Sequence, residues 1–265
     1  MKIAVLAKYG FEASNLFVDS SRNTIDLDRS PKKISESDLN AVEEAVRIKS
    51  VLPGSKISIF SVAKADPSKA LRELVAMGAD RGYFISYGGS IRIDESATAY
   101  LLKKALEKLG PFDLILAGHA SEDNYAGAVP QMIAHMLELP TLSYASKMKV
   151  ENNMVTIERD LDGNRETIEC ETPALVTVTH ELNKPRYATT LQVLRVPRDA
   201  VSQLKFEEDL GVSGQDLDRH VLRDQENLKL LTTSRKNVVF DGSDPKNAAR
   251  ELVEKLTMEG AFQIF

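Results

Sequence analysis

The sequence predicts an α/β protein in which helices cover both faces of a parallel sheet. Two observations carry this prediction. Short apolar runs of strand length alternate with longer segments of helical periodicity, and Gly or Pro residues stand where the helical segments end. Such alternation is typical of parallel strands that are joined by right-handed crossover connections.

The expected elements follow one another in a regular order. Strands are predicted at 2–7, 56–62, 81–86, 113–117 and 174–179, where the residues are mostly apolar. Helices are predicted after the capping segment 35–38, after Asp66-Pro67, from Asp94, and from about Val129-Pro130.

The remaining segments interrupt this order. We expect an excursion over 11–34 with a short hairpin around 19–21, and an antiparallel hairpin insertion over about 144–171 that turns at Asp162-Gly163. The region 181–194 lacks periodicity and is predicted to be a loop. We therefore predict a nucleotide-binding α/β domain over 1–194, and a C-terminal arm over 195–265 that packs on a partner subunit and has one clear helix at about 247–256.

Composition excludes several classes of protein. The chain has 265 residues and a net charge of −5 without a basic patch, which argues against nucleic acid as a partner. No apolar run reaches the length of a membrane span. The single cysteine, Cys170, excludes an internal disulfide and fits a reducing compartment, so the cytoplasm is the expected location. The four histidines lack the spacing of metal ligands, so no metal site is expected.

The segment from Gly118 to Met132 is the strongest candidate for a ligand site. It is a long loop at the carboxyl end of a predicted strand, where open α/β sheets bind their ligands. The N–H groups of Gln131 and Met132 at the helix start would suit a phosphate. Glu122 and Asp123 would repel a phosphate and are expected to bond to backbone or to ribose hydroxyls. A plain loop capped by Ser121 and Asp123 is the alternative.

Other patterns are weaker. The glycine-rich fingerprint of dinucleotide-binding folds and the Walker phosphate loop are both missing. His119 lies in the candidate loop and could contact a ligand, without support for a catalytic role. The neighbouring carboxylates Glu43 and Glu44 are interpreted as helix surface. The run from Asn183 to Tyr187 is either a rigid loop or a loop that docks a protein.

Several stretches together resemble one known family. They include Ala41 to Arg47, Ala76 to Gly82, and Glu158 to Gly163 followed by Pro173 to Thr177. The most specific is Asn183-Lys184-Pro185-Arg186-Tyr187-Ala188-Thr189. Along nearly its whole length the chain resembles the beta subunit of electron transfer flavoprotein.

The resemblance implies a Rossmann-like fold of the adenine nucleotide α-hydrolase type. It also implies a heterodimer with an alpha subunit that carries the redox FAD, and a role in passing electrons from flavin dehydrogenases to a quinone oxidoreductase. In this family the beta subunit does no bond-making chemistry. It holds AMP or, in electron-bifurcating members, a second FAD. A stand-alone adenine-nucleotide-binding module of similar fold is the alternative.

The resemblance also implies which residues of this sequence form the sites. The cofactor-binding residues would come from four segments: Leu6, Ala7 and Lys8; Ser35, Glu36, Ser37 and Asp38; Ser61, Val62 and Ala63; and Gly118, Ser121, Asp123, Asn124, Tyr125, Ala126, Gly127, Ala128, Val129, Pro130, Gln131 and Met132. The partner-docking residues would be Pro185, Arg186, Tyr187, Ala188, Thr189, Thr190 and Leu191.

This sequence departs from the family pattern near the nucleotide. Ser35-Glu36-Ser37 stands where the family has Asn-Pro-aromatic, Tyr125 replaces an Asp, and Ala128-Val129-Pro130 replaces a Thr or Gln followed by Gly. In the docking loop Thr190 takes the place of an anchoring Leu, with Leu191 one step on. These departures leave the choice between AMP and FAD open and point to a different choice of partner.

Overall fold

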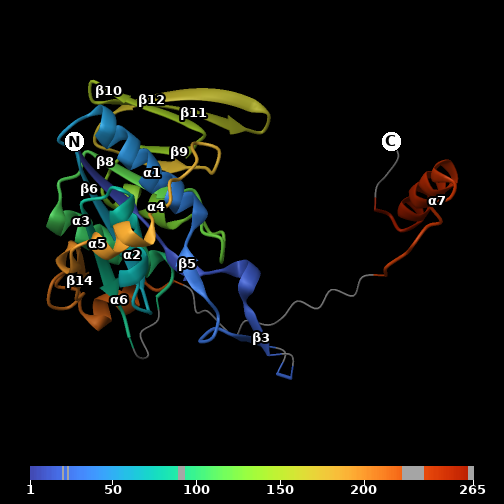
Figure 1. Ribbon diagram of the computed structural model, residues 1–265, viewed down its shortest axis with the longest axis horizontal. Helices are drawn as coiled ribbons and strands as arrows, with labels where there is room; N and C mark the ends of the chain where they lie inside the picture. Colours follow the sequence, from blue (N-terminus) through green and yellow to red (C-terminus); the bar gives the residue numbers. More distant parts are fainter. Residues whose placement is uncertain (20, 23, 89–92, 223–235, 262–265) are drawn as a thin grey trace. The chain divides into compact units, whose positions relative to one another are not determined.

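The computed structural model describes residues 1–19, 21–22, 24–88, 93–222 and 236–261. The chain divides into two compact units, Met1–Leu228 and Lys229–Phe265. Each unit is described by itself (Figure 1).

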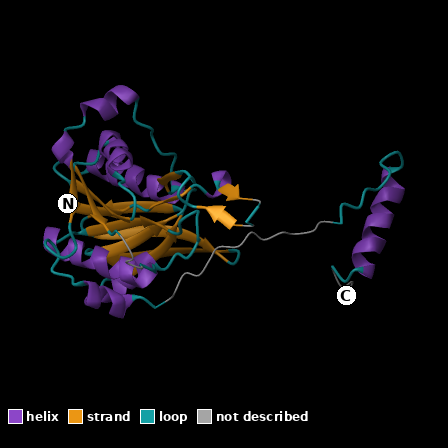
Figure 2. Ribbon diagram, turned by 90° about the horizontal axis from the view of Figure 1, so that it is seen from below, coloured by secondary structure: helices purple, strands orange, loops and turns teal. Residues whose placement is uncertain are grey.

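The first unit is built on a seven-stranded sheet, which confirms the predicted α/β class. All of its paired neighbours are parallel. Helices lie on both sides of the strands (Figure 2). From edge to edge the order is β14 (Val201–Leu204), β7 (Arg81–Ser86), β6 (Lys56–Ala63), β1 (Lys2–Leu6), β8 (Leu114–Gly118), β13 (Ala174–Val178) and β9 (Thr141–Ala145).

Two hydrophobic cores separate the sheet from its helices. Successive residues of a strand point to opposite faces, so Ile3 and Val5 enter one core while Ala4 enters the other. The first core holds the apolar faces of α1 (Glu36–Val51) and α2 (Ser68–Met77), and the second holds those of α3 (Glu95–Leu109), α4 (Val129–Met136) and α6 (Gly214–His220). Each fully buried Leu or Ile contributes about 1.5–3 kcal/mol.

The helix boundaries follow local chemistry. The side chain of Asp94 accepts a hydrogen bond from the backbone N–H of Ala97 at 2.9 Å and thereby caps α3. Pro130 lies in the first turn of α4, where its missing N–H costs nothing. Gly78 ends α2 at φ +137°, a conformation that other residues rarely adopt. The predicted helix starts at Asp94 and near Val129 are confirmed.

Smaller antiparallel elements surround the sheet. The excursion after β1 forms two hairpin-like pairs, and its predicted turn lies between β3 and β4; residues 20 and 23 are outside the described residues. The predicted insertion forms a three-stranded sheet whose Val155 and Ile157 enter the first core. These elements are β2 (Tyr9–Phe11), β5 (Lys32–Ile34), the short helix η1 (Ala13–Asn15), β3 (Phe17–Asp19), β4 (Thr24–Asp26), β10 (Lys147–Glu151), β11 (Met154–Leu161) and β12 (Asn164–Glu171).

Three segments differ from the sequence-based expectation. The start of the predicted insertion, at Tyr144, belongs to the edge strand β9 of the central sheet. The region predicted as a loop up to 194 includes the helix α5 (Thr190–Arg195). The expected domain boundary at 194 lies later, because the short helix η2 (Arg198–Ala200), β14 and α6 all belong to the first unit. Short edge elements carry too little periodicity to be recognised from sequence.

The second unit contains the helix α7 (Pro245–Met258), which spans the predicted helix at 247–256. The side chain of Asp244 caps it by accepting from the N–H groups of Lys246 and Asn247 at 3.1 and 3.2 Å. No residue of α7 is buried, and Leu252, Val253 and Met258 are exposed. Within the described residues of both units, no helix combines the length and apolarity that crossing a membrane requires.

Candidate functional site

The candidate site lies where the carboxyl ends of β1 and β8 meet at the centre of the sheet. After β1 the chain adds β6 and β7 on one side of this strand. The next strand, β8, lies on the other side of β1, and β13 and β9 lie beyond it. The strand order therefore reverses here, and such a switch point is the usual ligand position in open α/β sheets. The first turn of α1 and the loop after β8 meet at this point.

The carboxylate of Asp38 ties the two strand ends together. One of its oxygens accepts from the N–H of Lys8 at 2.8 Å, and the other accepts from the N–H of Gly118 at 2.8 Å. Burial raises the pKa of Asp38 to about 6, although the hydrogen bonds from Lys8 and Gly118 act in the opposite direction. The side chain is buried, and each of its two oxygens accepts a hydrogen bond from the protein backbone.

Gly118 allows α1 to approach the loop closely. A Cβ at this position would lie 2.2 Å from Oγ of Ser37 and 2.6 Å from Oδ1 of Asp38. The hydroxyl of Ser37 donates to the carbonyl of Ala120 at 2.7 Å and fastens the start of the loop to the helix. The last residue of β8 must therefore lack a side chain.

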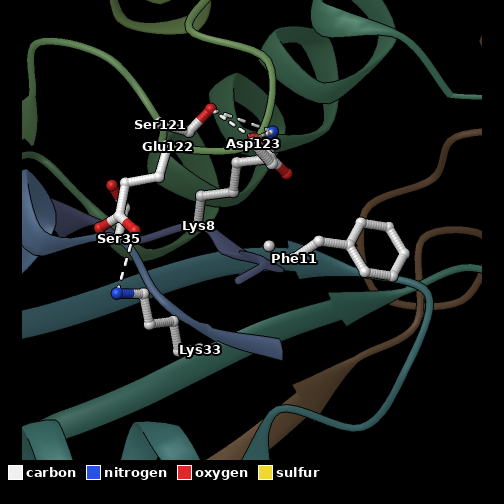
Figure 3. Close-up of a pocket in the computed structure, with 8 residues that line it drawn as sticks. Lys8, Phe11, Lys33, Ser35, Ser121, Glu122 and Asp123 are labelled. Atoms are coloured by element: carbon white, nitrogen blue, oxygen red, sulfur yellow. Dashed lines mark hydrogen bonds and ion pairs between the residues drawn. The ribbon is translucent and has the colours of Figure 1, made fainter. Parts of the chain in front are cut away.

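Three polar side chains converge on a shallow pocket at this edge (Figure 3). Nζ of Lys8 lies 2.6 Å from Oδ1 of Asp123 and donates to Oγ of Ser121 at 3.2 Å. Oγ of Ser121 donates to Oδ1 of Asp123 at 2.7 Å. The ion pair with Lys8 and the bond from Ser121 hold the pKa of Asp123 below its usual value, against the effect of burial. A partly covered lysine therefore stands in the pocket with its charge balanced.

A second ion pair closes the other side of the pocket. Nζ of Lys33 lies 3.0 Å from Oε2 of Glu122 and 3.3 Å from Oε1 of Glu36. Oε1 of Glu122 accepts from the N–H of Glu36 at 2.9 Å. Burial works against the charge of Lys33, but its acidic partners, Glu122 foremost, raise the pKa of its ammonium group above the usual value. The expectation that Glu122 and Asp123 bond to backbone groups is confirmed, since Asp123 also accepts from the N–H of Asn124 at 2.8 Å.

The rest of the loop is held by side chains outside the pocket. Nδ2 of Asn124 donates to Oε1 of Glu95 at 2.9 Å. Nε2 of His119 lies 3.0 Å from the hydroxyl of Tyr125, and Nδ1 lies 3.2 Å from the carbonyl of Val178. Tyr125 is exposed and adopts φ +52°. His119 thus supports the loop through Tyr125 and the end of β13.

The start of α4 carries a free donor. Among the described residues, the N–H of Gln131 has no hydrogen-bond partner. The N–H of Met132 is not available, contrary to the prediction, because it donates to the carbonyl of Ala128 at 3.0 Å. The predicted phosphate-facing residues Ala126 to Met132 do not line the pocket.

The predicted binding residues fall into distinct positions. Lys8, Ser35, Ser121 and Asp123 line the pocket. Leu6 and Ala7 are buried in the two cores, and Ser61 and Ala63 on the adjacent strand β6 are also buried. Among the described residues, Oγ of Ser61 is buried without a hydrogen-bond partner. Four lining residues were outside the predicted set of binding residues: Gly10, Phe11, Lys33 and Glu122. Lys33 reaches the pocket through the pairing of β5 with β2, whereas Glu122 lies in the predicted loop between Ser121 and Asp123.

The predicted docking loop is attached to the middle of α1. Glu43 and Glu44 were expected on the helix surface, but their residues are only 3% and 8% exposed. Nε of Arg186 donates to Oε2 of Glu43 at 2.7 Å, and Nδ2 of Asn183 donates to Oε2 of Glu44 at 3.0 Å. The interpretation as surface residues was wrong, because the loop after β13 folds back over both carboxylates. Asn40 and Asn183 also bond reciprocally.

Beyond these contacts the loop exposes apolar side chains. Tyr187 is 77% exposed, Leu191 is 66% exposed and Leu194 is 69% exposed. Leu191 and Leu194 are three residues apart on α5, so they lie on the same side of that helix. Nη2 of Arg72 on α2 donates to the carbonyls of Val193 and Val196 at 3.3 and 3.0 Å. An apolar patch of Tyr187, Leu191 and Leu194 is thus presented on a fixed segment.

Comparison with known proteins assigns the chain to a family. The model of the electron transfer flavoprotein domain matches residues 23–206. The chain is 32% identical to the electron transfer flavoprotein subunit beta of Thermoanaerobacterium thermosaccharolyticum, over 97% of this chain and 98% of the relative. The chain belongs to the electron transfer flavoprotein beta subunit family.

Two further relatives match about four fifths of this chain. The caffeyl-CoA reductase-Etf complex subunit CarD of Acetobacterium woodii is 31% identical over 80% of this chain and 81% of the relative. The electron transfer flavoprotein subunit beta of Megasphaera elsdenii is 31% identical over 81% of this chain and 84% of the relative. Membership of this family implies a role in an electron transfer flavoprotein and an alpha-subunit partner.

Proposed function

We propose that this chain is the beta subunit of a heterodimeric electron transfer flavoprotein that passes electrons from flavin dehydrogenases to a quinone oxidoreductase. The observation that carries the proposal is similarity to a named beta subunit over nearly the full length of both chains. The redox FAD would be held by the alpha subunit or shared with it. This chain would complete the flavin environment and would make or break no bonds itself.

An adenine nucleotide would bind at the carboxyl edge of β1 and β8. The residues that line the pocket there include Lys8, with its ammonium group, and Ser35 and Ser121, with their hydroxyls. Lys8 and Lys33 are matched by Asp123 and Glu122, so the pocket carries no excess positive charge. Such a balanced polar pocket suits the ribose or base of a nucleotide better than its phosphate.

The phosphate would lie further along the same loop, at the start of α4. The unpaired N–H of Gln131 and the positive end of the helix dipole favour an anion there. Small residues from Ala126 to Ala128 leave the backbone accessible. The residues present therefore fit a nucleotide.

Either AMP or a second FAD would occupy this position. CarD, which is named as a subunit of a caffeyl-CoA reductase-Etf complex, and the beta subunit of Megasphaera elsdenii are both 31% identical to this chain, so identity favours neither nucleotide. Two residues depart from the family pattern here: Tyr125 precedes the segment that would face the phosphate, and Pro130 lies within it. We expect these two positions to influence the choice.

Two exposed surfaces would bind protein partners. The apolar patch of Tyr187, Leu191 and Leu194 would dock flavin dehydrogenases, since exposed apolar side chains on an ordered segment are typical of contact anchors. In the second unit, α7 presents Leu252 and Val253 to solvent and would pack on the alpha subunit. Partner binding would bury apolar area on each surface.

The proposal is tested by co-expressing the chain with a candidate alpha subunit. A stable one-to-one complex with the visible absorption of bound flavin is the expected result. A colourless chain that associates with no alpha subunit would contradict the proposal and would favour a stand-alone nucleotide-binding module. A variant that lacks residues 229–265 should lose the alpha subunit while its first unit stays folded, as judged by its circular dichroism.

A further inference from the structure

The docking segment, defined here as residues 183–196, is held by two separate polar anchors. Its first end is bound to α1 through Asn183 and Arg186. Its second end is bound to α2 through the carbonyls of Val193 and Val196. The apolar patch lies between the two anchors.

The first anchor is built from buried groups of α1. Asn40 and Asn183 exchange three hydrogen bonds of 2.8–3.0 Å through side chains and backbone. Both oxygens of Glu43 pair with Arg186, at 2.7 and 2.9 Å, and its Oε1 also accepts from Nε of Arg47 at 3.0 Å. A buried carboxylate that is paired twice costs several kcal/mol to expose or to leave alone. This cost restrains the position of Arg186.

The two carboxylates of the first anchor differ in charge balance. Burial opposes the charge of Glu43, but the hydrogen bonds from Arg186 hold its pKa below the usual value. Burial raises the pKa of Glu44, which has only Asn183 as a hydrogen-bond partner among the described residues. Glu43 is therefore the member that is paired directly with a cation, and this pair fixes the segment.

The second anchor closes the end of α5. The last carbonyls of a helix have no partners within the helix, and Nη2 of Arg72 supplies one to Val193 and to Val196. At the other end of α5, Thr189 and Gln192 form a capping box, with Oε1 of Gln192 accepting from the N–H of Thr189 at 2.8 Å. Both ends of this six-residue helix are thereby satisfied.

α5 is too short to be stable alone. Isolated helices of fewer than about 12 residues are marginal in water. Its residues include no buried side chain, so a hydrophobic core does not hold it either. The order of α5 must come from its two ends.

We propose that Glu43, with Asn40 and Glu44, and Arg72 are positioning residues that hold the docking segment in its partner-binding shape. The inference rests on the proposed docking function for its biological meaning, whereas the anchoring itself concerns this chain alone. Preorganisation of this kind lowers the entropy that a loop loses when it binds.

Hydrogen exchange of the full chain, followed by mass spectrometry, tests the anchoring directly. Glu43→Gln should speed amide exchange over 185–189 roughly tenfold, and Arg72→Met should do the same over 190–196. Trypsin should cleave faster after Arg186 in the first variant and after Arg195 in the second. Glu73→Gln, an exposed carboxylate on α2, is the matched control and should leave both readouts unchanged.

Two further measurements separate positioning from a general loss of fold. The far-ultraviolet circular dichroism of Arg186→Gln should match that of the wild type, while exchange over 185–189 rises as it does in Glu43→Gln. The double variant that combines Glu43→Gln with Arg186→Gln should exchange no faster than either single variant, because each substitution removes the same interaction. Exchange in the anchor variants equal to that of Glu73→Gln would overturn the proposal.

The docking function can be tested separately from the anchoring of the segment. Leu191→Ser should weaken binding of the heterodimer to a purified flavin dehydrogenase while exchange of the segment stays at the wild-type rate. If that binding is unaffected, the docking function is wrong and the anchoring result still stands. If binding is lost in Leu191→Ser but retained at full strength in Glu43→Gln, the segment docks without needing its anchors and the inference is wrong.

Discussion

The loops that follow the adjacent strands β8 and β13 are fastened by the same helix in different ways. The first turn of α1 holds the β8 loop through Ser37 and Asp38. Its following turns hold the β13 loop through Glu43 and Glu44. One loop gathers charged and hydroxyl groups around a pocket, and the other directs its polar groups to α1 and exposes apolar ones.

This difference separates two tasks at one edge of the sheet. A ring of balanced polar groups suits a small polar ligand, whereas an exposed apolar patch on a restrained segment suits a protein. α1 serves as the common support for both loops. Variants of one loop should therefore leave the task of the other unchanged.

The largest effect is expected from Gly118→Ala at the base of the β8 loop. The added Cβ would lie 2.2 Å from Oγ of Ser37, so α1 or the loop must move. We expect a loss of about 3 kcal/mol in the free energy of unfolding, measured with urea. Gly214→Ala is the control, since a Cβ there meets nothing within 4 Å. Equal stability of the two variants would show that the close approach of α1 is not required.

The next effect concerns Asp38, whose pKa burial raises to about 6. Because the folded-state pKa lies above the unfolded one, the contribution to stability is complete below about pH 4 and is lost as the pH rises through about 6. Between these values the free energy of unfolding should fall by about 2 to 3 kcal/mol more in the wild type than in Asp38→Asn. Carbon-13 NMR of the Asp38 carboxyl gives the same answer, and titration near pH 4 would contradict it.

A smaller effect should be confined to the β13 loop. Leu191→Ser removes an exposed apolar anchor and should weaken dehydrogenase binding by about 2 kcal/mol without changing the free energy of unfolding. Titration of the heterodimer with a purified flavin dehydrogenase measures this loss. The nucleotide content should be unchanged, and a variant that also loses its nucleotide would contradict the separation of the two tasks.

The smallest effect is expected from Lys8→Met in the pocket. This change removes the ammonium group that contacts Ser121 and Asp123, and should weaken retention of the nucleotide by about 1 kcal/mol. Equilibrium dialysis with AMP measures it, and Lys32→Met on the neighbouring strand is the control. Docking of the dehydrogenase should be unaffected. Loss of docking in Lys8→Met would contradict the separation of tasks between the β8 loop and the β13 loop.

Much of the fold follows from sequence periodicity. The central strands and the helices around them have clear apolar patterns, and Gly or Pro marks their ends. The edge strands β9 and β14 escaped recognition because their sequences mix polar and apolar residues, unlike the nearly continuous apolar runs of the equally short central strands. The first lay within a weakly alternating run, and the second within a polar region.

The part of the site that follows a strand end could be predicted from the sequence. The contacts between residues far apart in the sequence could not. Gly118, Ser121 and Asp123 follow a recognisable strand, so the loop could be found from sequence. The pairing of Glu43 with Arg186 joins residues 143 positions apart, and adjacent carboxylates on a helix are otherwise typical of its surface. Lys33 reaches the pocket only because β5 pairs with β2 next to the end of β1.

The nucleotide content of the heterodimer tests the central claim most directly. The complex with the alpha subunit is purified, denatured, and its released FAD and AMP are counted per heterodimer. The account predicts one FAD for the alpha subunit and one further adenine nucleotide, which is AMP or a second FAD, bound by this chain. A single FAD with no second adenine nucleotide would contradict it.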